Sequence, residues 1–174
     1  MTSRNPRISR GWIEAWAAEY GDYDSSRVED LFGKAKPTYD DIERVYRWKS
    51  ARSVGHFLTN DPERVVSAVR SALRAKDDAA ALARVETLNG VKARTGSALL
   101  AIFRPERYTV MDWRARQTLE AFGHLRDLPK ASWTDVWPGY MSLCRDIASR
   151  TGVSLRDLDR ALWGAQGSID RPRR

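Results

Sequence analysis

The sequence predicts an all-α fold, and two patterns in it support this prediction. Apolar residues recur at helical spacing along most of the chain, whereas no segment alternates apolar and polar residues for long enough to form a convincing strand. Proline and short polar residues precede several of these apolar runs, and glycine follows others, as at helix starts and ends. The 174 residues are enough for one domain with a substantial core, or for two lobes that share one.

Five helical segments are predicted before residue 75, and Thr38 begins the third of them. Gly21 and Gly33 end the first two, because glycine adopts the left-handed backbone conformation that closes many helices. Asn60-Asp61-Pro62 begins the fifth, since a polar cap is followed there by a proline in the first turn. The apolar residues expected on the buried faces are Trp12, Ile13, Trp16, Val28, Leu31, Phe32, Ile42, Val45, Tyr46, Val54, Phe57, Val65, Val66, Val69, Ala72 and Leu73.

Five more helical segments are predicted after residue 75. Asp77 or Asp78 caps the first, Asp112 precedes the third, and Ser154 caps the last. Pro138 must lie in the first turn of the long fourth helix or kink it, because proline removes a backbone donor from a helix interior. The apolar residues expected on the buried faces are Leu82, Val85, Leu88, Ala115, Leu119, Phe122, Trp133, Val136, Trp137, Tyr140, Cys144, Ile147, Leu155, Leu158 and Leu162.

Most of the net charge of +7 lies at the two ends of the chain. Residues 1–10 and 171–174 hold six of the 30 basic residues, which leaves 24 basic against 23 acidic residues in 11–170. We therefore expect one helical domain over 11–170 with a disordered basic arm before it and a basic tail after it. Such arms can add sequence-independent affinity for phosphate. Inside the domain, only residues 92–116 are clearly basic, with six cations against two acids.

The single cysteine, Cys144, excludes an intramolecular disulfide and any site that needs four cysteines, such as an iron–sulfur cluster. No apolar run approaches the roughly 20 residues of a membrane helix. The first residues contain no apolar signal segment. The sequence therefore predicts a cytoplasmic protein with no membrane partner, no metal and no cofactor.

Residues 88–103 predict a helix end, a tight hairpin and a second helix. Gly90 follows Leu88 and Asn89 where the first helix should stop, and it lets another backbone or a phosphate approach closely. The small residues Thr95-Gly-Ser-Ala98 then let a neighbouring helix pack close. The amides at the start of this helix form a potential anion site. Two alternatives stay open: a purely structural hairpin without a ligand, and a structural monovalent cation bound at the hairpin.

The residues around this hairpin resemble a known motif. Leu88-x-Gly90-Val91-x-x-x-Thr95, followed by Ala98-Leu-Leu and by Val110-x-Asp112-x-x-Ala115, resembles the block that carries the hairpin and the catalytic aspartate in the HhH-GPD (helix-hairpin-helix) DNA glycosylase superfamily. The segment from Pro105 to Ala115 is most similar to small bacterial members with a reduced glycosylase fold. The resemblance covers about residues 80–123. It implies two helical lobes with a cleft between them, and the hairpin and Asp112 on the cleft wall.

The resemblance also implies roles for individual residues. Contacts to DNA would come from the hairpin residues Gly90, Val91, Lys92, Arg94 and Thr95. Arg94 occupies the position of the Schiff-base lysine of bifunctional relatives, and arginine cannot act as an amine nucleophile because it stays protonated. The implied enzyme is therefore monofunctional. Asn89 and Lys92 depart from the family's proline and second glycine, which puts the standard hairpin geometry in doubt.

Asp112 corresponds to the family's catalytic aspartate, and it also stands where a helix N-cap is expected. The two roles are compatible, because capping amides and the helix dipole favour an ionised carboxylate. An ionised carboxylate beside a sugar can stabilise an oxocarbenium-like transition state and can orient or deprotonate the attacking water.

Further contacts to an extruded base or to phosphates are expected from Trp48, Lys49 and Arg52, and from Trp113 and Arg114 beside Asp112. The simpler alternative for the first group is a core tryptophan with a solvated basic flank, and Trp113 can equally be a core residue. Core packing accounts for the other five tryptophans, which are Trp12, Trp16, Trp133, Trp137 and Trp163.

The resemblance thus predicts a protein that binds duplex DNA and hydrolyses the N-glycosidic bond of a modified base. One alternative is a DNA-binding or damage-sensing module without catalysis, and a second is a protein-interaction scaffold without a role on DNA. The sequence indicates neither the base nor the oligomeric state.

Overall fold

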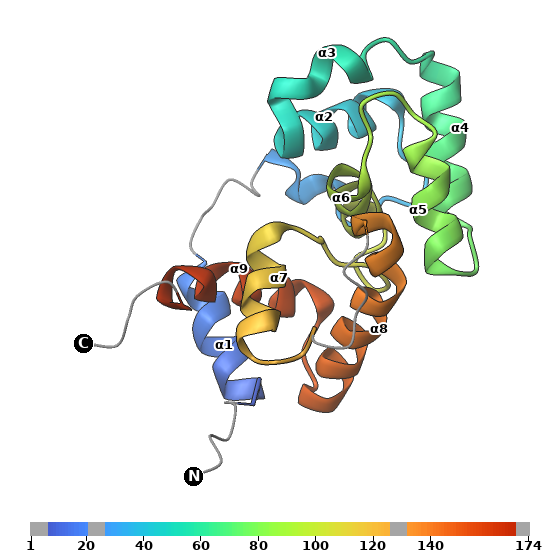
Figure 1. The fold of residues 1–174 in the computed structure, drawn as a ribbon. Helices are drawn as coiled ribbons and strands as arrows, with labels where there is room; N and C mark the ends of the chain where they lie inside the picture. Colours follow the sequence, from blue (N-terminus) through green and yellow to red (C-terminus); the bar gives the residue numbers. More distant parts are fainter. Residues whose placement is uncertain (1–6, 21–26, 126–131, 170–174) are drawn as a thin grey trace.

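The computed structural model describes residues 7–20, 27–125 and 132–169, apart from the side chains of 167–169. Within these ranges the chain is helical and contains no strand, so the predicted all-α class is confirmed there. None of the helices in the described ranges is long and apolar enough to cross a membrane. Figure 1 shows the helices in two groups, one above the other, with α6 between them.

The first group surrounds α6 (Ala93–Phe103). It consists of α2 (Tyr39–Ser50), α3 (Val54–Phe57), α4 (Pro62–Leu73) and α5 (Asp78–Glu86), with short 3-10 turns at Glu29–Leu31 and Ala51–Ser53. Every residue of α6 is buried except Arg94, so this helix forms the centre of the group. The small residues at its start have the predicted effect, because a Cβ at Gly96 would lie 2.8 Å from Leu82 Cδ1 of α5.

The second group consists of α1 (Arg10–Glu19), α7 (Trp113–Ala121) and α9 (Leu155–Ile169), with α9 packed against both others. Gly164 makes the α1 contact possible, since a Cβ there would lie 2.8 Å from the Trp16 carbonyl oxygen. On the other side of α9, Thr118 Oγ1 donates to the Leu162 carbonyl at 2.7 Å. The long α8 (Trp133–Thr151) contacts α5 and α6 of the first group and α9 of the second, and so joins the two.

The expected helix boundaries agree with the structure where they depend on a local cap. Thr38 and Asp41 form a capping box at α2, Asp61 caps α4, and Asp77 rather than Asp78 caps α5. Ser154 Oγ accepts a hydrogen bond from the Asp157 amide at the start of α9. Pro138 lies inside α8 beyond its first turn, so the first-turn alternative is wrong. Gly21 lies outside the described residues.

The predicted arm over residues 1–10 is too long. Ile8 is 5% exposed and belongs to the core, Ser9 Oγ caps α1 by accepting from the Trp12 amide, and Arg10 is the first residue of that helix. A single buried isoleucine between polar residues gave no periodic signal in the sequence. Residues 1–6 and the tail at 171–174 lie outside the described residues.

Candidate functional site

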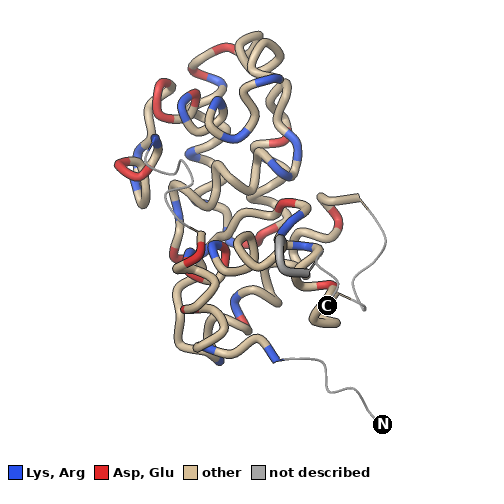
Figure 2. The backbone as a smooth tube through the Cα atoms, turned by 90° about the vertical axis from the view of Figure 1, so that its left-hand side faces the viewer, with Lys and Arg blue, Asp and Glu red and all other residues tan. Residues whose placement is uncertain are grey.

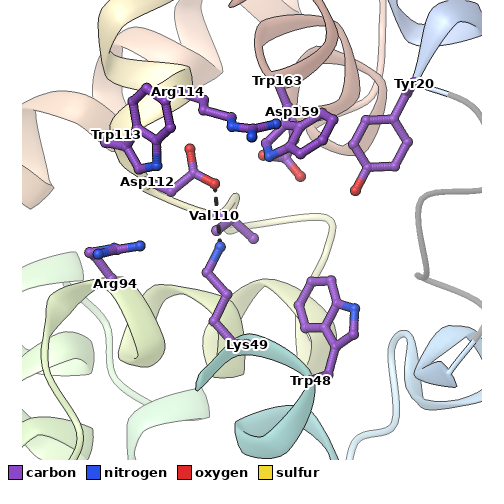
Figure 3. A pocket seen from close by; sticks show the side chains of 10 residues that line it. All are labelled: Tyr20, Trp48, Lys49, Arg94, Val110, Asp112, Trp113, Arg114, Asp159 and Trp163. Carbon is purple, nitrogen blue, oxygen red and sulfur yellow. Dashed lines mark hydrogen bonds and ion pairs between the residues drawn. The ribbon is translucent and has the colours of Figure 1, made fainter. Parts of the chain in front are cut away.

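A pocket of about 240 Å³ lies between the two groups of helices (Figure 3). Trp48, Lys49 and Arg94 approach it from the first group, whereas Tyr20, Asp112, Trp113, Arg114, Asp159 and Trp163 approach it from the second. Val110, in the segment that joins α6 to α7, forms part of its wall. The pocket thus brings together six of the site residues that the sequence predicts: Trp48, Lys49, Arg94, Asp112, Trp113 and Arg114.

Asp112 divides its two carboxylate oxygens between two partners. Oδ1 accepts a hydrogen bond from the Ala115 amide at 3.0 Å, which caps α7 as the sequence predicts. Oδ2 accepts from Lys49 Nζ at 3.3 Å across the pocket. The side chain of Asp112 is 10% exposed, and that of Lys49 is 16% exposed. One oxygen is therefore structural, while the other faces the pocket.

The backbone before Asp112 is fixed by two buried hydrogen bonds. Ser97 Oγ, on α6, accepts from the Met111 amide at 3.0 Å, and Tyr140 Oη, on α8, donates to the Val110 carbonyl at 2.9 Å. Both Ser97 and Tyr140 are completely buried. Because each of these partners sits on a different helix, the carboxylate at residue 112 has a defined position relative to both groups.

Lys49 is held in place through its neighbours on α2. Tyr46 Oη donates to the Gly90 carbonyl at 2.8 Å, and Ser50 and Thr95 share a hydrogen bond between their hydroxyls at 3.1 Å. These contacts tie α2 to the hairpin and to the start of α6. The interpretation of Lys49 as part of a solvated flank is therefore wrong, because its ammonium points into the pocket (Figure 3).

Asp159 is a second carboxylate of the pocket, and the sequence analysis did not identify it. Burial raises the pKa of Asp159 to about 6; the Arg156 guanidinium, which donates to Oδ2 at 3.1 Å, opposes this effect, and the charge of Asp112 adds to it. A signal was present in the sequence. Asp159 lies four residues after Leu155 and three before Leu162, on the face of α9 that carries the buried leucines.

Aromatic side chains form much of the remaining wall. Trp113 is 42% exposed at the pocket, so the alternative of a core position is wrong. Trp163 also lines the pocket, and the Arg114 guanidinium lies 4.0 Å from the centre of the Trp163 ring. The prediction that Trp163 is purely a core residue is therefore wrong. Tyr20 faces the pocket from the end of α1, a position that gave no signal in the sequence.

The hairpin comprises the end of α5, the turn at 87–92 and the start of α6. Gly90 has φ of +80°, as the tight turn requires. The atoms that approach Gly90 closely belong to the protein itself, because a Cβ there would lie 2.9 Å from Tyr46 Oη and 3.0 Å from the Phe57 amide nitrogen. Hydrogen bonds to Asn60 explain why Asn89 stands where the HhH-GPD hairpin motif has a proline. Its amide donates to Asn60 Oδ1 at 2.8 Å, and its carbonyl accepts from Asn60 Nδ2 at 3.0 Å.

Apart from Gly90, two of the five residues that the sequence predicts to contact DNA are buried and two are exposed. Val91 is completely buried and Thr95 is 5% exposed, so their side chains belong to the core and are not available to DNA. Lys92 and Arg94 are exposed. Lys92 is the N-cap of α6 without a side-chain hydrogen bond to the first-turn amides, and it is not among the described residues that line the pocket.

The basic stretch at 92–116 is only partly available to a ligand. Arg104 donates to the Leu73 carbonyl, and Arg107 donates to the carbonyls of Ala75 and Lys76, so two of its six cations hold the chain together. Along the described backbone, Lys and Arg positions are interspersed with Asp and Glu positions (Figure 2). Arg52 is exposed and is not among the described residues that line the pocket.

The described residues contain no group of three or more His, Cys, Asp or Glu side chains that could hold a metal ion.

No protein-family model, curated protein or solved structure matches the chain. The resemblance to the glycosylase superfamily therefore rests on the motif residues alone, and it stays a hypothesis. The geometry of the pocket has to support any function on its own.

Proposed function

We propose that the protein binds duplex DNA and hydrolyses the N-glycosidic bond of a modified or damaged base. One observation carries the proposal: Asp112 is anchored through Oδ1, while its Oδ2 faces Lys49 in a small pocket walled by aromatic rings. A carboxylate with one oxygen fixed and the other directed at a ligand suits the stabilisation of positive charge on a sugar.

Asp112 would act on the deoxyribose. As the bond to the base breaks, positive charge develops on the sugar ring, and a preorganised carboxylate stabilises that charge without having to reorganise. The same oxygen can orient or deprotonate the attacking water. The hydrogen bonds of Met111 and Val110 support this role, because they hold the backbone beside the carboxylate still.

The rest of the pocket suits one flat, polar group. Its volume of about 240 Å³ lies just below the 300–1,000 Å³ or so of typical small-molecule sites. Trp48 and Trp163 offer ring faces or edges to an extruded base, and the nearby charges offer hydrogen bonds to its edge. Trp48 packs against the hydrophobic core, and Trp163 contacts the Tyr20 ring and the Arg114 guanidinium, so little side-chain freedom is lost when a base enters.

The DNA backbone would be held beside this pocket by the start of α6. Lys92 and Arg94 are exposed there, and the first-turn amides have no side-chain cap. Arg94 belongs both to this helix start and to the pocket wall. A phosphate held here would therefore lie next to the nucleotide that enters the pocket.

A second candidate function is DNA binding without catalysis. The observation in its favour is the ion pair itself, because the Lys49 ammonium already neutralises the carboxylate that catalysis requires. In that case the pocket would recognise a base and leave its bond intact.

Release of free bases separates these candidates. Duplex DNA that has been alkylated, oxidised or deaminated is incubated with the protein, and released bases are detected by mass spectrometry. The proposal expects release by the wild type and its loss in Asp112→Asn, which keeps a capping side chain. Salt-sensitive binding without release supports the non-catalytic module, and absence of binding at about 0.1 M salt supports a protein-interaction scaffold.

A further inference from the structure

We infer that the surface beside α4 holds a second ligand site, which binds a nucleoside polyphosphate. Two neighbouring hollows form this site, and both are lined by Arg70 and Arg74 at the end of α4. The two arginines are four residues apart, so they lie on the same face of the helix. The inference does not rest on the proposed function, because the residues that line the hollows include none of those that line the pocket between the two helix groups.

The central helix separates this site from that pocket. Arg94 lines the pocket near the start of α6, whereas Phe103 and Arg104 line one of the hollows at the end of the same helix. Phe103 comes nine positions after Arg94, which corresponds to about 14 Å along a helix axis. A ligand in the hollows would therefore leave the pocket free.

The hollow at the end of α6, here called the cationic hollow, is suited to an anion. Its volume of about 520 Å³ is in the range of typical small-molecule sites. Four cations line it against one acid, and that acid is already paired with a cation at 3.0 Å. Like charges around one hollow repel each other, so a bound anion is favoured there. The cations are Lys36, Arg70, Arg74 and Arg104, and the acid is Glu106.

Two of these cations are held in fixed positions by backbone carbonyls. Arg70 donates to the Pro37 carbonyl through Nε at 3.3 Å and through Nη2 at 3.1 Å, and Arg104 Nη1 donates to the Leu73 carbonyl at 2.6 Å. These bonds leave Nη1 of Arg70 and Nη2 of Arg104 free to donate to a ligand. A guanidinium anchored in this way loses little side-chain entropy when it binds a phosphate.

The other two cations are not explained by contacts within the protein. Lys36 and Arg74 are exposed, and the side chain of neither makes a hydrogen bond or an ion pair with the described part of the chain. A cation is favoured at a helix C-terminus, which accounts for Arg74 at the end of α4. Lys36 belongs to the segment before α2 and still lines the same hollow. An anionic ligand explains why these charges come together.

The neighbouring hollow, here called the apolar hollow, has a volume of about 590 Å³. Tyr39 is half-buried in its wall, and the Tyr39 ring is stacked 6.3 Å from that of Phe57, so it offers a flat surface that is already fixed. The hydroxyl of Ser67 and the carboxylate of Glu63 add hydrogen-bonding groups. Besides these three residues and the two shared arginines, Pro62 and Val66 line this hollow.

A nucleoside polyphosphate matches the two hollows together. Its phosphates carry several negative charges and accept paired hydrogen bonds from guanidinium groups. Its base is flat and stacks on aromatic rings. Because Arg70 and Arg74 line both hollows, the phosphates would lie in the cationic hollow and the nucleoside would lie in the apolar hollow against Tyr39.

Isothermal titration calorimetry with ATP tests the inference, with EDTA present and at about 0.15 M salt to screen non-specific attraction. The wild type should bind ATP at one site. Lys36→Ala and Arg74→Ala should each weaken binding about 10-fold, and the double variant about 100-fold, because each change removes a charge-assisted hydrogen bond to phosphate. Arg150→Ala removes an exposed cation that is paired with Asp146, and it should bind ATP like the wild type.

Thermal unfolding checks that the variants are folded. Without ligand, the double variant should unfold at the temperature of the wild type, since neither side chain makes a structural contact. ATP should raise the melting temperature of the wild type and not that of the double variant, because a ligand stabilises the state that binds it. Undiminished ATP affinity in the double variant, or no binding of ATP by the wild type, would overturn the inference.

Inorganic triphosphate and duplex DNA separate this ligand from other phosphates. Triphosphate should bind more weakly than ATP because it cannot use the apolar hollow, and equal affinity would overturn the assignment to a nucleotide. Displacement of ATP by duplex DNA, with weaker duplex binding by the double variant, would make this surface part of the DNA interface and overturn the inference. Base release from damaged DNA should be the same in the double variant and the wild type, so failure of the proposed hydrolysis would leave this site standing.

Discussion

Lys49 Nζ lies 3.3 Å from Asp112 Oδ2, and this contact joins α2 of one helix group to the start of α7 in the other. The two residues are 63 positions apart in the sequence. The hairpin motif includes Asp112 but not Lys49, so the motif describes only half of the charged centre of the pocket. The proposed hydrolysis depends on this pair, since Asp112 would stabilise the sugar cation with the oxygen that Lys49 contacts.

Asn89→Pro, which introduces the proline of the HhH-GPD hairpin motif, should destabilise the protein. Proline has no amide hydrogen, so the bond from residue 89 to Asn60 Oδ1 is lost and a buried acceptor stays unpaired. We expect the free energy of unfolding to fall by about 1–3 kcal/mol in urea denaturation. Asn89→Ala is the matched control, because it keeps the amide and loses only the exposed bond to Thr59. Equal stability of the proline variant and the wild type would contradict this account of the hairpin.

Gly164→Ala should loosen the packing of α1 against α9. The new Cβ would lie 2.8 Å from the Trp16 carbonyl oxygen, and a backbone atom can move only if the helices separate. The steric cost exceeds the gain of roughly 1 kcal/mol that alanine brings to a helix interior, so a net loss of about 1–2 kcal/mol is expected. Gly11→Ala, in α1, meets nothing within 4 Å and should leave stability unchanged or higher. Thermal unfolding of both variants tests this expectation. A melting temperature of Gly164→Ala equal to that of Gly11→Ala would contradict the close contact between α1 and α9.

The stability of the protein should depend on pH through Asp159. Burial raises the pKa of this carboxyl from 3.8 to about 6, so the folded state binds a proton that the unfolded state has already lost between these pH values. Its contribution is fully present below about pH 4 and is lost as the pH rises through about 6, a change of at most about 3 kcal/mol at 1.4 kcal/mol per pKa unit.

Asp159→Asn removes this titration and keeps an acceptor for Arg156. Chemical denaturation at several pH values should show that the variant gains stability relative to the wild type between pH 4 and 7. Asp146→Asn, at an exposed carboxylate, serves as the control. Parallel profiles of the wild type and Asp159→Asn would show that Asp159 does not titrate in this range.

DNA binding should weaken uniformly when the exposed cations at the start of α6 are removed. The slope of log K against log salt is about −0.9 for each phosphate contact, so Lys92→Ala and Arg94→Ala should each make that slope less negative by about one. Fluorescence anisotropy measures this slope, in a background where Arg4, Arg7, Arg171, Arg173 and Arg174 are glutamine so that the charges of the two ends add nothing. Arg150→Ala removes a cation already paired with Asp146 and should leave the slope unchanged. Unchanged slopes for both hairpin variants would place the DNA elsewhere.

The sequence predicted those features that depend on neighbours along the chain. Thr38, Asp61 and Asp112 each cap a helix through the amide three residues later, so the residue types alone locate the helix starts. The resemblance to the hairpin motif, rather than a local cap, assigned Asp112 and Arg94 to one site.

The pocket could not be predicted in the same way, because its walls come from helices far apart in the sequence. Trp163 follows the buried Leu162 on an amphipathic helix, and nothing local distinguishes a tryptophan that faces a pocket from one that faces the core. Val91 shows the converse error. Its place in the motif suggested a DNA contact, whereas tertiary packing buries it completely. Asp159 could have been identified from the sequence, because an acidic residue on the leucine face of a helix is itself unusual.

The most direct test of the central claim is the single-turnover rate of base release by the wild type and by Asp112→Asn, on a duplex that carries the lesion most readily released from damaged DNA. The asparagine keeps the cap on α7 and removes the charge that faces the sugar, so we expect the rate to fall by about 100-fold or more with little change in DNA affinity. Equal rates for the two proteins, or release by neither on any lesion tested, would contradict the assignment of Asp112 as a catalytic residue.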